Sequence, residues 1–273
     1  MKPGITLLRI ATPRTLDDAL SLLRDESLVP IAGATDLYVG LNFGTLAATQ
    51  FIDITRLPEL RGITVRDDRL VIGAGVSYTA IMGSALVQQR LPMLVQAASQ
   101  VGGVQIQNRG TLGGNIANGS PAGDSLPVLA AGDAMLVLRS ANGERCVPFN
   151  SFYTGYRTSV LRADELIVSI ELPPCDGIQW FRKVGTRAAQ AISKLVIAAV
   201  RAPVPRIAIG SVAATTVRLP RTEAALAAGA GMEEACNILQ SEITPIDDIR
   251  SSADYRRTVA ANLLRRFWAD TGA

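Results

Sequence analysis

Short apolar runs separated by small and polar residues mark the first part of the chain. One run at 29–32 enters the segment 33–36, Gly-Ala-Thr-Asp, and a second run covers 50–54. Runs of this length, bounded by turn-forming residues, are typical of strands. The pattern predicts a strand, a tight turn, a short helix and a second strand.

The central part combines two hairpin patterns with helical spacing. Each hairpin pattern pairs two apolar runs across a turn, with Asp67-Asp68 in the first turn and Asn142-Gly143 in the second; such residues favour hairpins. Between the hairpins, apolar positions at helical spacing predict helices over 79–87, 92–100 and 125–131. The glycine-rich stretch 109–124 is interpreted as a loop.

The pattern changes after 172–177, where two prolines and a glycine predict a domain boundary. Beyond it, the periodicity predicts three strands and then three helices: 180–184, 195–201, 207–212, 221–228, 233–242 and 254–270. In the last helix, apolar residues recur every four positions at Tyr255, Val259, Leu263 and Phe267. We expect this stripe to pack on the sheet.

The composition is that of a globular protein with no strongly charged partner. Of 273 residues, 48% are hydrophobic and 19% charged, and 27 basic against 24 acidic residues leave a formal charge of +3. Basic and acidic residues are interleaved, which argues against a nucleic-acid partner. The longest strongly apolar run, 195–200, is too short to span a bilayer, and no signal peptide is evident. We expect a cytoplasmic protein without a membrane span.

The residue types that are missing restrict the chemistry further. The chain has no histidine, which removes serine–histidine and cysteine–histidine nucleophile systems and imidazole metal sites. Its three cysteines, Cys146, Cys175 and Cys236, are far apart in the sequence, so their spacing suits neither a zinc site nor an iron–sulfur cluster. We therefore expect no metal site on this chain.

Two glycine-bearing segments are candidates for binding chemistry. In the first, 31–37, a strand ends in a turn with small side chains, so consecutive backbone N–H groups are accessible and can form a nest for a phosphate. The same Gly-x-Thr-Asp pattern also arises because Thr and Asp cap helices. Taken alone, the first segment leaves both interpretations open.

The second segment, 109–124, is more specific. It contains five glycines and few bulky side chains, so a ligand could approach the backbone closely. Its polar side chains would supply hydrogen bonds: Thr111, Asn115, Asn118, Ser120 and Asp124. The chain has neither GxxxxGK[ST] nor a GxGxxG after a strand, so neither P-loop nor Rossmann binding is supported.

Four segments together carry a resemblance to a known family. They are 32–37, 110–115 continuing to 120–124, 152–157 followed by 165–170, and 245–250 leading to Tyr255-Arg256. In these segments, and over essentially its whole length, the chain resembles the FAD-binding (medium) subunit of the molybdenum hydroxylases, the family of xanthine dehydrogenase and carbon monoxide dehydrogenase.

The resemblance implies an α+β fold in two domains. Residues 1–174 would form an FAD-binding domain of the vanillyl-alcohol-oxidase (PCMH) type, with subdomains of about 1–56 and 57–174. Residues 175–273 would form a smaller α+β domain like the C-terminal domain of the CO dehydrogenase flavoprotein, with a three-stranded sheet and helices.

The resemblance also implies FAD as the cofactor and a set of contacts for it. These are Ile31, Ala32, Gly33, Ala34, Thr35, Asp36 and Leu37 around the pyrophosphate, and Thr111, Gly114, Asn115, Ser120 and Asp124 in the second segment. Ile167 would make an apolar contact near the flavin ring, and Lys183 would lie by the isoalloxazine, with Arg182 as the alternative. Related chains often carry Gly or Asn at position 34, and many carry Arg at Gln107.

As a function, the resemblance implies an electron-transfer subunit without catalytic residues of its own. The chain would take electrons from the [2Fe-2S] clusters of a partner subunit and pass them to NAD⁺ or another acceptor, while a third subunit holds the molybdenum cofactor. The complex is expected to be a dimer of heterotrimers. Two alternatives stay open: a self-contained flavoprotein oxidase or reductase, and a non-redox nucleotide-binding scaffold.

Overall fold

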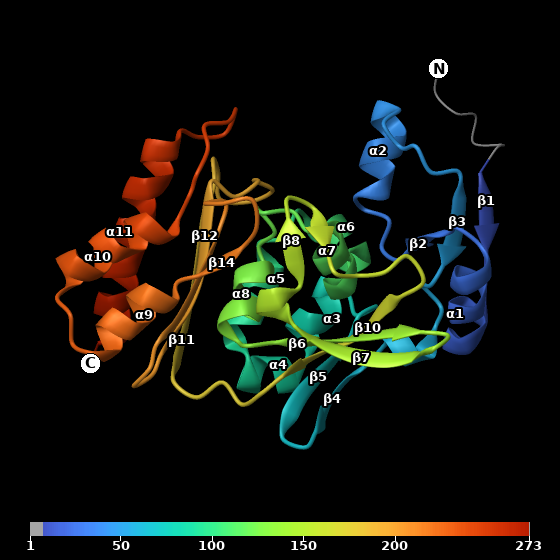
Figure 1. Cartoon of the computed structure of the whole chain (residues 1–273), viewed down its shortest axis with the longest axis horizontal. Coiled ribbons are helices and arrows are strands. Elements are labelled where there is room, and N and C mark those ends of the chain that lie inside the picture. Colours follow the sequence, from blue (N-terminus) through green and yellow to red (C-terminus); the bar gives the residue numbers. More distant parts are fainter. Residues whose placement is uncertain (1–7, 273) are drawn as a thin grey trace.

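Three large sheets, each with its own helices, follow one another along the chain (Figure 1). The computed structural model describes residues 8–272. The first two sheets lie side by side at one end of the molecule, and the third stands between them and the three C-terminal helices.

The first sheet is parallel and has the strand order β1-β3-β2. Its elements are β1 (Arg9–Ala11), α1 (Leu16–Asp25), β2 (Val29–Ile31), α2 (Leu37–Phe43) and β3 (Gln50–Asp53). Helix α1 begins at Thr15, whose side chain accepts a hydrogen bond from the Asp18 N–H. It buries Leu16 and Leu20 against Ile52. The predicted strand, turn, short helix and strand are all present.

The second sheet is antiparallel and has the strand order β4-β5-β10-β6-β7. Its strands are β4 (Ile63–Arg66), β5 (Arg69–Gly73), β6 (Met135–Ser140), β7 (Gly143–Pro148) and β10 (Leu166–Leu172). Both predicted hairpins form, and Asp67 and Asp68 adopt positive φ in the turn of the first one. A separate two-stranded ribbon follows, β8 (Tyr153–Gly155) and β9 (Thr158–Ser159).

Six short helices lie between β5 and β6. They are α3 (Tyr78–Gly83), α4 (Ala85–Arg90), α5 (Pro92–Ser99), α6 (Val104–Arg109), α7 (Leu112–Asn118) and α8 (Leu126–Ala131). The single helix predicted over 79–87 is two helices, because Ser84 caps α4 with its side chain. The interpretation of 109–124 as a loop is wrong in part: Thr111 caps α7, and Gly119 ends it in the left-handed conformation.

The third sheet is antiparallel and has the strand order β11-β12-β13-β14. Its strands are β11 (Ile178–Val184), β12 (Leu195–Arg201), β13 (Arg206–Gly210) and β14 (Val217–Arg218). The three predicted strands are present, and β14 adds a short fourth one that alternation could not reveal in two residues. The three predicted helices follow as α9 (Pro220–Ala227), α10 (Met232–Glu242) and α11 (Ala253–Thr271).

Strand β12 is buried on both faces and joins the two halves of the molecule. Its residues Val196, Ala198 and Val200 belong to the core of the second sheet, and Leu195 and Ile197 belong to the core under the C-terminal helices. Successive side chains of a strand point to opposite faces. Helices α5 and α8 therefore cover one face of the third sheet, and α9 to α11 cover the other (Figure 1).

The expected stripe on α11 is wrong in part. Tyr255 is 42% exposed, Val259 and Leu263 are only partly buried, and Phe267 is buried as expected. The other buried positions of the helix are Arg256, Ala260, Ala261, Leu264 and Thr271. Burial of Arg256 is possible because its guanidinium lies 2.7 Å from Asp248 and donates to the Ser211 carbonyl.

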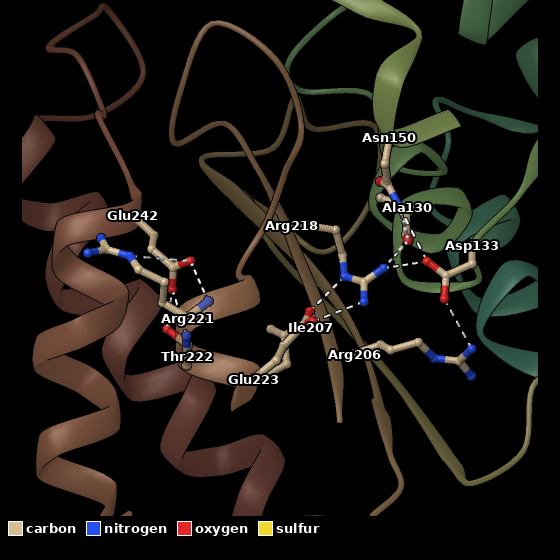
Figure 2. Close-up of polar contacts among 10 residues, drawn as sticks. All are labelled: Ala130, Asp133, Asn150, Arg206, Ile207, Arg218, Arg221, Thr222, Glu223 and Glu242. Atoms are coloured by element: carbon tan, nitrogen blue, oxygen red, sulfur yellow. Dashed lines mark hydrogen bonds and ion pairs between the residues drawn. The ribbon is translucent and has the colours of Figure 1, made fainter. Parts of the chain in front are cut away.

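A second polar contact holds the third sheet against α8 (Figure 2). Asp133, which follows α8, pairs with Arg218 at 2.6 Å and with Arg206 at 3.3 Å. Arg218 also forms two hydrogen bonds to Glu223 and one to the Ala130 carbonyl. Each charged group of this contact therefore has an ionic partner, and the buried Nε of Arg206 is left without a hydrogen bond.

Candidate cofactor-binding cleft

A cleft with a volume of about 990 Å³ lies between the first and second sheets. This volume is at the upper end of the roughly 300–1,000 Å³ typical of ligand pockets. The first sheet and its loops contribute residues 29–30, 32–37 and 54–55. The second sheet and its helices contribute residues around 60–63, 74–80, 101–118 and 161–167.

The two glycine-bearing segments meet in this cleft. A Cβ atom placed on Gly33 would lie 2.6 Å from the Arg109 carbonyl carbon and 2.9 Å from the Gly110 Cα. Both neighbours are backbone atoms, which cannot move aside cheaply. Only glycine permits this approach, so the first segment is held directly against the start of the second.

The first segment presents backbone donors to the cleft. Within the described residues, the N–H groups of Gly33, Ala34, Thr35 and Asp36 have no hydrogen-bond acceptor in the protein, and all four residues line the cleft. Backbone N–H groups are normally paired when they are not in contact with water or a ligand. Four adjacent unpaired donors favour an anion such as a pyrophosphate.

Ala34 adopts an unusual backbone conformation in this segment. Its φ is +61°, in the left-handed region that disfavours residues with a Cβ. Gly and Asn, the residues that the resemblance implies at this position, enter that region at the lowest cost.

The second segment differs, because most of its backbone donors are already used. The N–H groups of Leu112 and Gly113 donate to the Val76 and Ala74 carbonyls, and the Gly114 N–H donates to Thr111 Oγ1. What this wall offers is therefore mainly side chains. Within the described residues, its cleft-lining donors without an acceptor are the N–H and hydroxyl of Thr111 and the side chains of Arg109, Asn115 and Asn118.

Glycines of the second segment serve packing more than ligand approach. A Cβ on Gly113 would lie 2.6 Å from the Ala74 Cβ, and one on Gly110 would lie 3.0 Å from the Ile106 carbonyl. Gly114 is exposed and lines the cleft, and the one nearby atom there is the Thr111 hydroxyl oxygen. Close backbone approach by a ligand is possible at Gly114.

The cleft collects most of the predicted cofactor contacts. Those that line it are Ala32, Gly33, Ala34, Thr35, Asp36, Leu37, Thr111, Gly114, Asn115 and Ile167. Those that do not are Ile31, Ser120, Asp124 and Lys183. Ile31 ends strand β2, where its carbonyl accepts from the Ile54 N–H, and Ser120 accepts from the Ala122 N–H within its own turn.

Asp124 and Lys183 instead form a buried pair between the second and third sheets. Lys183 Nζ lies 2.7 Å from Asp124 Oδ2 and donates to the Gln100 carbonyl at 2.8 Å, and Ser193 donates to Asp124 Oδ1 at 2.5 Å. Burial raises the pKa of Asp124, and the hydrogen bonds and charge of Lys183 oppose that shift. Lys183 and Gln100 also line a small cavity of about 80 Å³ next to the cleft residue Val101.

The choice between Lys183 and Arg182 follows from strand geometry. These neighbours on β11 point to opposite faces. Lys183 points toward Asp124, whereas Arg182 lies over the Trp180 ring and 3.8 Å from Asp270 of α11. Of the two, only Lys183 faces the half of the molecule that contains the cleft.

Sequence reasoning missed one wall of the cleft, residues 60–63 and 74–78. The sequence feature that could have indicated this wall is Gly73-Ala74-Gly75 at the end of β5. A Cβ on Gly73 would lie 2.5 Å from the Leu60 carbonyl oxygen, so the backbone there is closely packed. It also missed Glu165, a cleft residue whose carboxylate binds Arg145 at 2.6 Å. The hydrogen bonds from Arg145 lower the pKa of Glu165, so it stays ionised.

The cleft fits an elongated dinucleotide. Its volume is sufficient, and its first wall supplies unpaired N–H groups for phosphates. Its second wall supplies polar side chains, which include the charged Arg109 and Glu165 as well as the neutral Thr111 and Asn115. Within residues 8–272, no helix is long and apolar enough to cross a membrane, and no group of three or more Cys, Asp or Glu side chains could hold a metal ion.

Comparison with known proteins identifies the family. The model described as the FAD binding domain in molybdopterin dehydrogenase matches residues 6–175, and the CO dehydrogenase flavoprotein C-terminal domain matches residues 180–271. The chain belongs to this family of FAD-binding domains. The resemblance noted from the sequence, the α+β fold and the assignment of FAD are thereby confirmed.

Individual relatives agree with this assignment. The chain is 32% identical to the carbon monoxide dehydrogenase medium chain of Hydrogenophaga pseudoflava over 93% of both chains. It is 40% identical to the xanthine dehydrogenase FAD-binding subunit of Escherichia coli O157:H7 over 162 residues, 59% of this chain and 56% of that one. The FAD-binding chain is thus a subunit of an oxidoreductase.

Solved structures share the fold over nearly the whole chain. A carbon monoxide dehydrogenase from Hydrogenophaga pseudoflava that lacks the Mo-pyranopterin moiety matches with a TM-score of 0.90 and 30% identity, over 97% of this chain and 96% of that one. Quinoline 2-oxidoreductase from Pseudomonas putida 86 matches with a TM-score of 0.91 and 24% identity, over 99% and 98%; this similarity shows the fold alone.

Proposed function

We propose that this chain holds FAD in the cleft and is the electron-transfer subunit of a molybdenum hydroxylase. It takes electrons from [2Fe-2S] clusters of a partner subunit and passes them to NAD⁺ or another acceptor. The observation that carries the proposal is the run of four unpaired N–H groups at Gly33–Asp36, held against the second glycine segment.

The residues of the cleft divide the binding of FAD among them. The N–H groups of 33–36 hold the pyrophosphate, and Thr111 and Asn115 donate from the opposite wall. Ile167, 6% exposed on β10, supplies an apolar contact toward the flavin. The Asp124–Lys183 pair lies outside the cleft, beside the small cavity, and makes no contact in this division. Bound FAD supplies the exchange between one-electron and two-electron transfer, and the protein supplies position and electrostatics.

The partners follow from the relatives. Several are named as medium chains or subunits, including a carbon monoxide dehydrogenase medium chain and a nicotinate dehydrogenase FAD-subunit. We propose that an iron–sulfur subunit and a molybdenum-cofactor subunit complete this complex as a dimer of heterotrimers. We also propose that the FAD-binding domain ends at residue 174.

A spectroscopic and copurification experiment tests this function. The full chain, purified alone, is expected to bind FAD, to be yellow and bleachable by dithionite, and to leave xanthine and aldehydes unoxidised. A tagged chain expressed with its natural partners is expected to copurify iron and molybdenum. A chain that does not bind FAD would support the scaffold alternative, and oxidation of an organic substrate by the lone chain would support the self-contained oxidase.

A further inference from the structure

A chain of three polar side chains leads from the protein interior to the cleft. Tyr78 of α3 and Ser125, the residue before α8, are 2% and 0% exposed. The Tyr78 hydroxyl lies 3.3 Å from Ser125 Oγ, and Ser125 Oγ lies 2.8 Å from Asn115 Oδ1 on α7. Asn115 is half-buried and lines the cleft.

The Ser125 hydroxyl is not explained by its position in the fold. Ser125 occupies the N-cap of α8, but its side chain makes no capping hydrogen bond. Capping is the usual reason for a serine at this position. Its two side-chain hydrogen bonds go to Tyr78 and Asn115 instead.

Either hydroxyl of the Tyr78–Ser125 contact could donate, but only one direction gives both hydroxyl protons an acceptor. Within residues 8–272, Ser125 Oγ is the one hydrogen-bond partner of the buried Tyr78 hydroxyl, so the Tyr78 proton is satisfied only when Tyr78 donates. The Ser125 proton must then go to Asn115, the one other side-chain partner of a residue with no exposure. Ser125 therefore donates to the Asn115 carbonyl oxygen.

This direction decides which end of the Asn115 amide faces the cleft. An asparagine amide can be turned by 180° with little change in shape, and its surroundings select one orientation. The opposite orientation would make Ser125 accept from both neighbours and leave its own proton without an acceptor. With Oδ1 bound to Ser125, the Asn115 Nδ2 has no partner within the described residues and is free to donate to a ligand.

We infer that Ser125, supported by Tyr78, is a positioning residue that fixes the Asn115 amide so that its NH₂ group donates to FAD. The inference rests on the proposed function, because it requires FAD to occupy the cleft. Ser125 does not line the cleft, and the hydroxyl of Tyr78, whose residue does line it, is bonded to Ser125. Both act through Asn115, and their removal weakens FAD binding without removing any direct contact.

The test is a set of FAD dissociation constants measured by flavin fluorescence on the full apo chain. Asn115→Ala is expected to raise the Kd for FAD about tenfold, Ser125→Ala about fivefold and Tyr78→Phe about twofold. In the Asn115→Ala background, Ser125→Ala is expected to have no further effect, because its only route to FAD is gone. A purely structural role would weaken binding in both backgrounds.

Tyr153→Phe is the matched control. The Tyr153 hydroxyl donates to the carbonyl of Ile116, which lies on α7 like Asn115, at 2.8 Å. The substitution removes a hydrogen bond that is partly buried, as the Ser125–Asn115 bond is, and leaves the contacts of Asn115 unchanged. Thermal stability is expected to fall about as much as in Ser125→Ala, with an unchanged Kd for FAD.

The outcomes separate this inference from the proposed function. A wild-type chain that does not bind FAD overturns both assignments. An Asn115→Ala variant that binds FAD as tightly as the wild type overturns this inference alone and leaves the proposed function standing. If Asn115→Ala weakens binding and Ser125→Ala does not, or if the two effects add fully in the double variant, the positioning role alone is overturned.

Discussion

The cleft and the contact between α8 and the third sheet treat their polar groups in opposite ways. At Gly33–Asp36 four donors lie side by side without an acceptor in the described part of the chain. Around Asp133, the guanidinium groups of Arg218 and Arg206 and the carboxylate of Glu223 all have partners (Figure 2). A contact whose charged groups are paired within the protein holds structural elements together, whereas adjacent N–H groups without an acceptor are available to a ligand.

The same difference exists between the two walls of the cleft. The first wall presents four adjacent unpaired N–H groups, whereas the second wall uses most of its backbone donors within the protein and presents mainly side chains. Substitution of a polar side chain should therefore remove a possible ligand contact in the second wall. In the first wall, only substitutions that shift the backbone should do so.

Gly33→Ala tests the backbone wall and should have the largest effect. The added methyl group would overlap the Arg109 carbonyl, so the two segments must separate. We expect the free energy of unfolding to fall by up to about 3 kcal/mol and FAD affinity to fall roughly a hundredfold. Urea unfolding and FAD titration measure the two effects.

Gly83→Ala is the control for this variant. Gly83 ends α3, outside the cleft, and a Cβ there would have no atom within 4 Å. FAD affinity should be unchanged. If Gly33→Ala binds FAD as tightly as Gly83→Ala does, the two segments do not form the site.

Arg218→Met tests the structural contact. It leaves Glu223, 6% exposed, without its cationic partner, which should lower the free energy of unfolding by about 3 kcal/mol. FAD affinity at temperatures well below unfolding should not change. Arg221→Met in α9 is the control. Its side chain is 62% exposed and lies 4.0 Å from Glu242, and Glu242 keeps its hydrogen bonds from the N–H and hydroxyl of Thr222; the variant should cost less than about 0.5 kcal/mol. Equal effects on both variants would contradict a buried structural role for Arg218.

Ala34→Gly should have the smallest effect and the opposite sign. Glycine adopts the φ of +61° without the steric cost that alanine has, which stabilises the folded state. Glycine also increases the conformational entropy of the unfolded chain, which opposes part of this gain. The free energy of unfolding should therefore rise by about 0.5 kcal/mol. Ala32→Gly, two positions earlier and without a positive φ, should instead lower it by about 0.5–1 kcal/mol. Thermal unfolding of both variants checks the difference in sign.

Local patterns determine much of this fold. Both hairpins, the strand–turn–helix at 29–43 and the apolar run of β12 depend on neighbouring residues, whose preferences act over a few positions. The four segments that carry the family resemblance likewise indicate the FAD-binding family from their residue order alone. Ten of the predicted contacts line one cleft, among them Gly33 and Asn115.

Local patterns failed where a distant partner decides the outcome. Periodicity could not place Arg256 inside, because its burial depends on Asp248 and Ser211, which come from other elements. The glycine-rich pattern predicts room for a ligand at positions 110 and 113, although Ala74 and Ile106 occupy that space. The sequence alone determined which residue types could bind FAD. Only the tertiary structure decided which donors stay unpaired and which way the Asn115 amide faces. The acceptor that a donor binds depends on every acceptor within reach, and many of these come from distant parts of the chain.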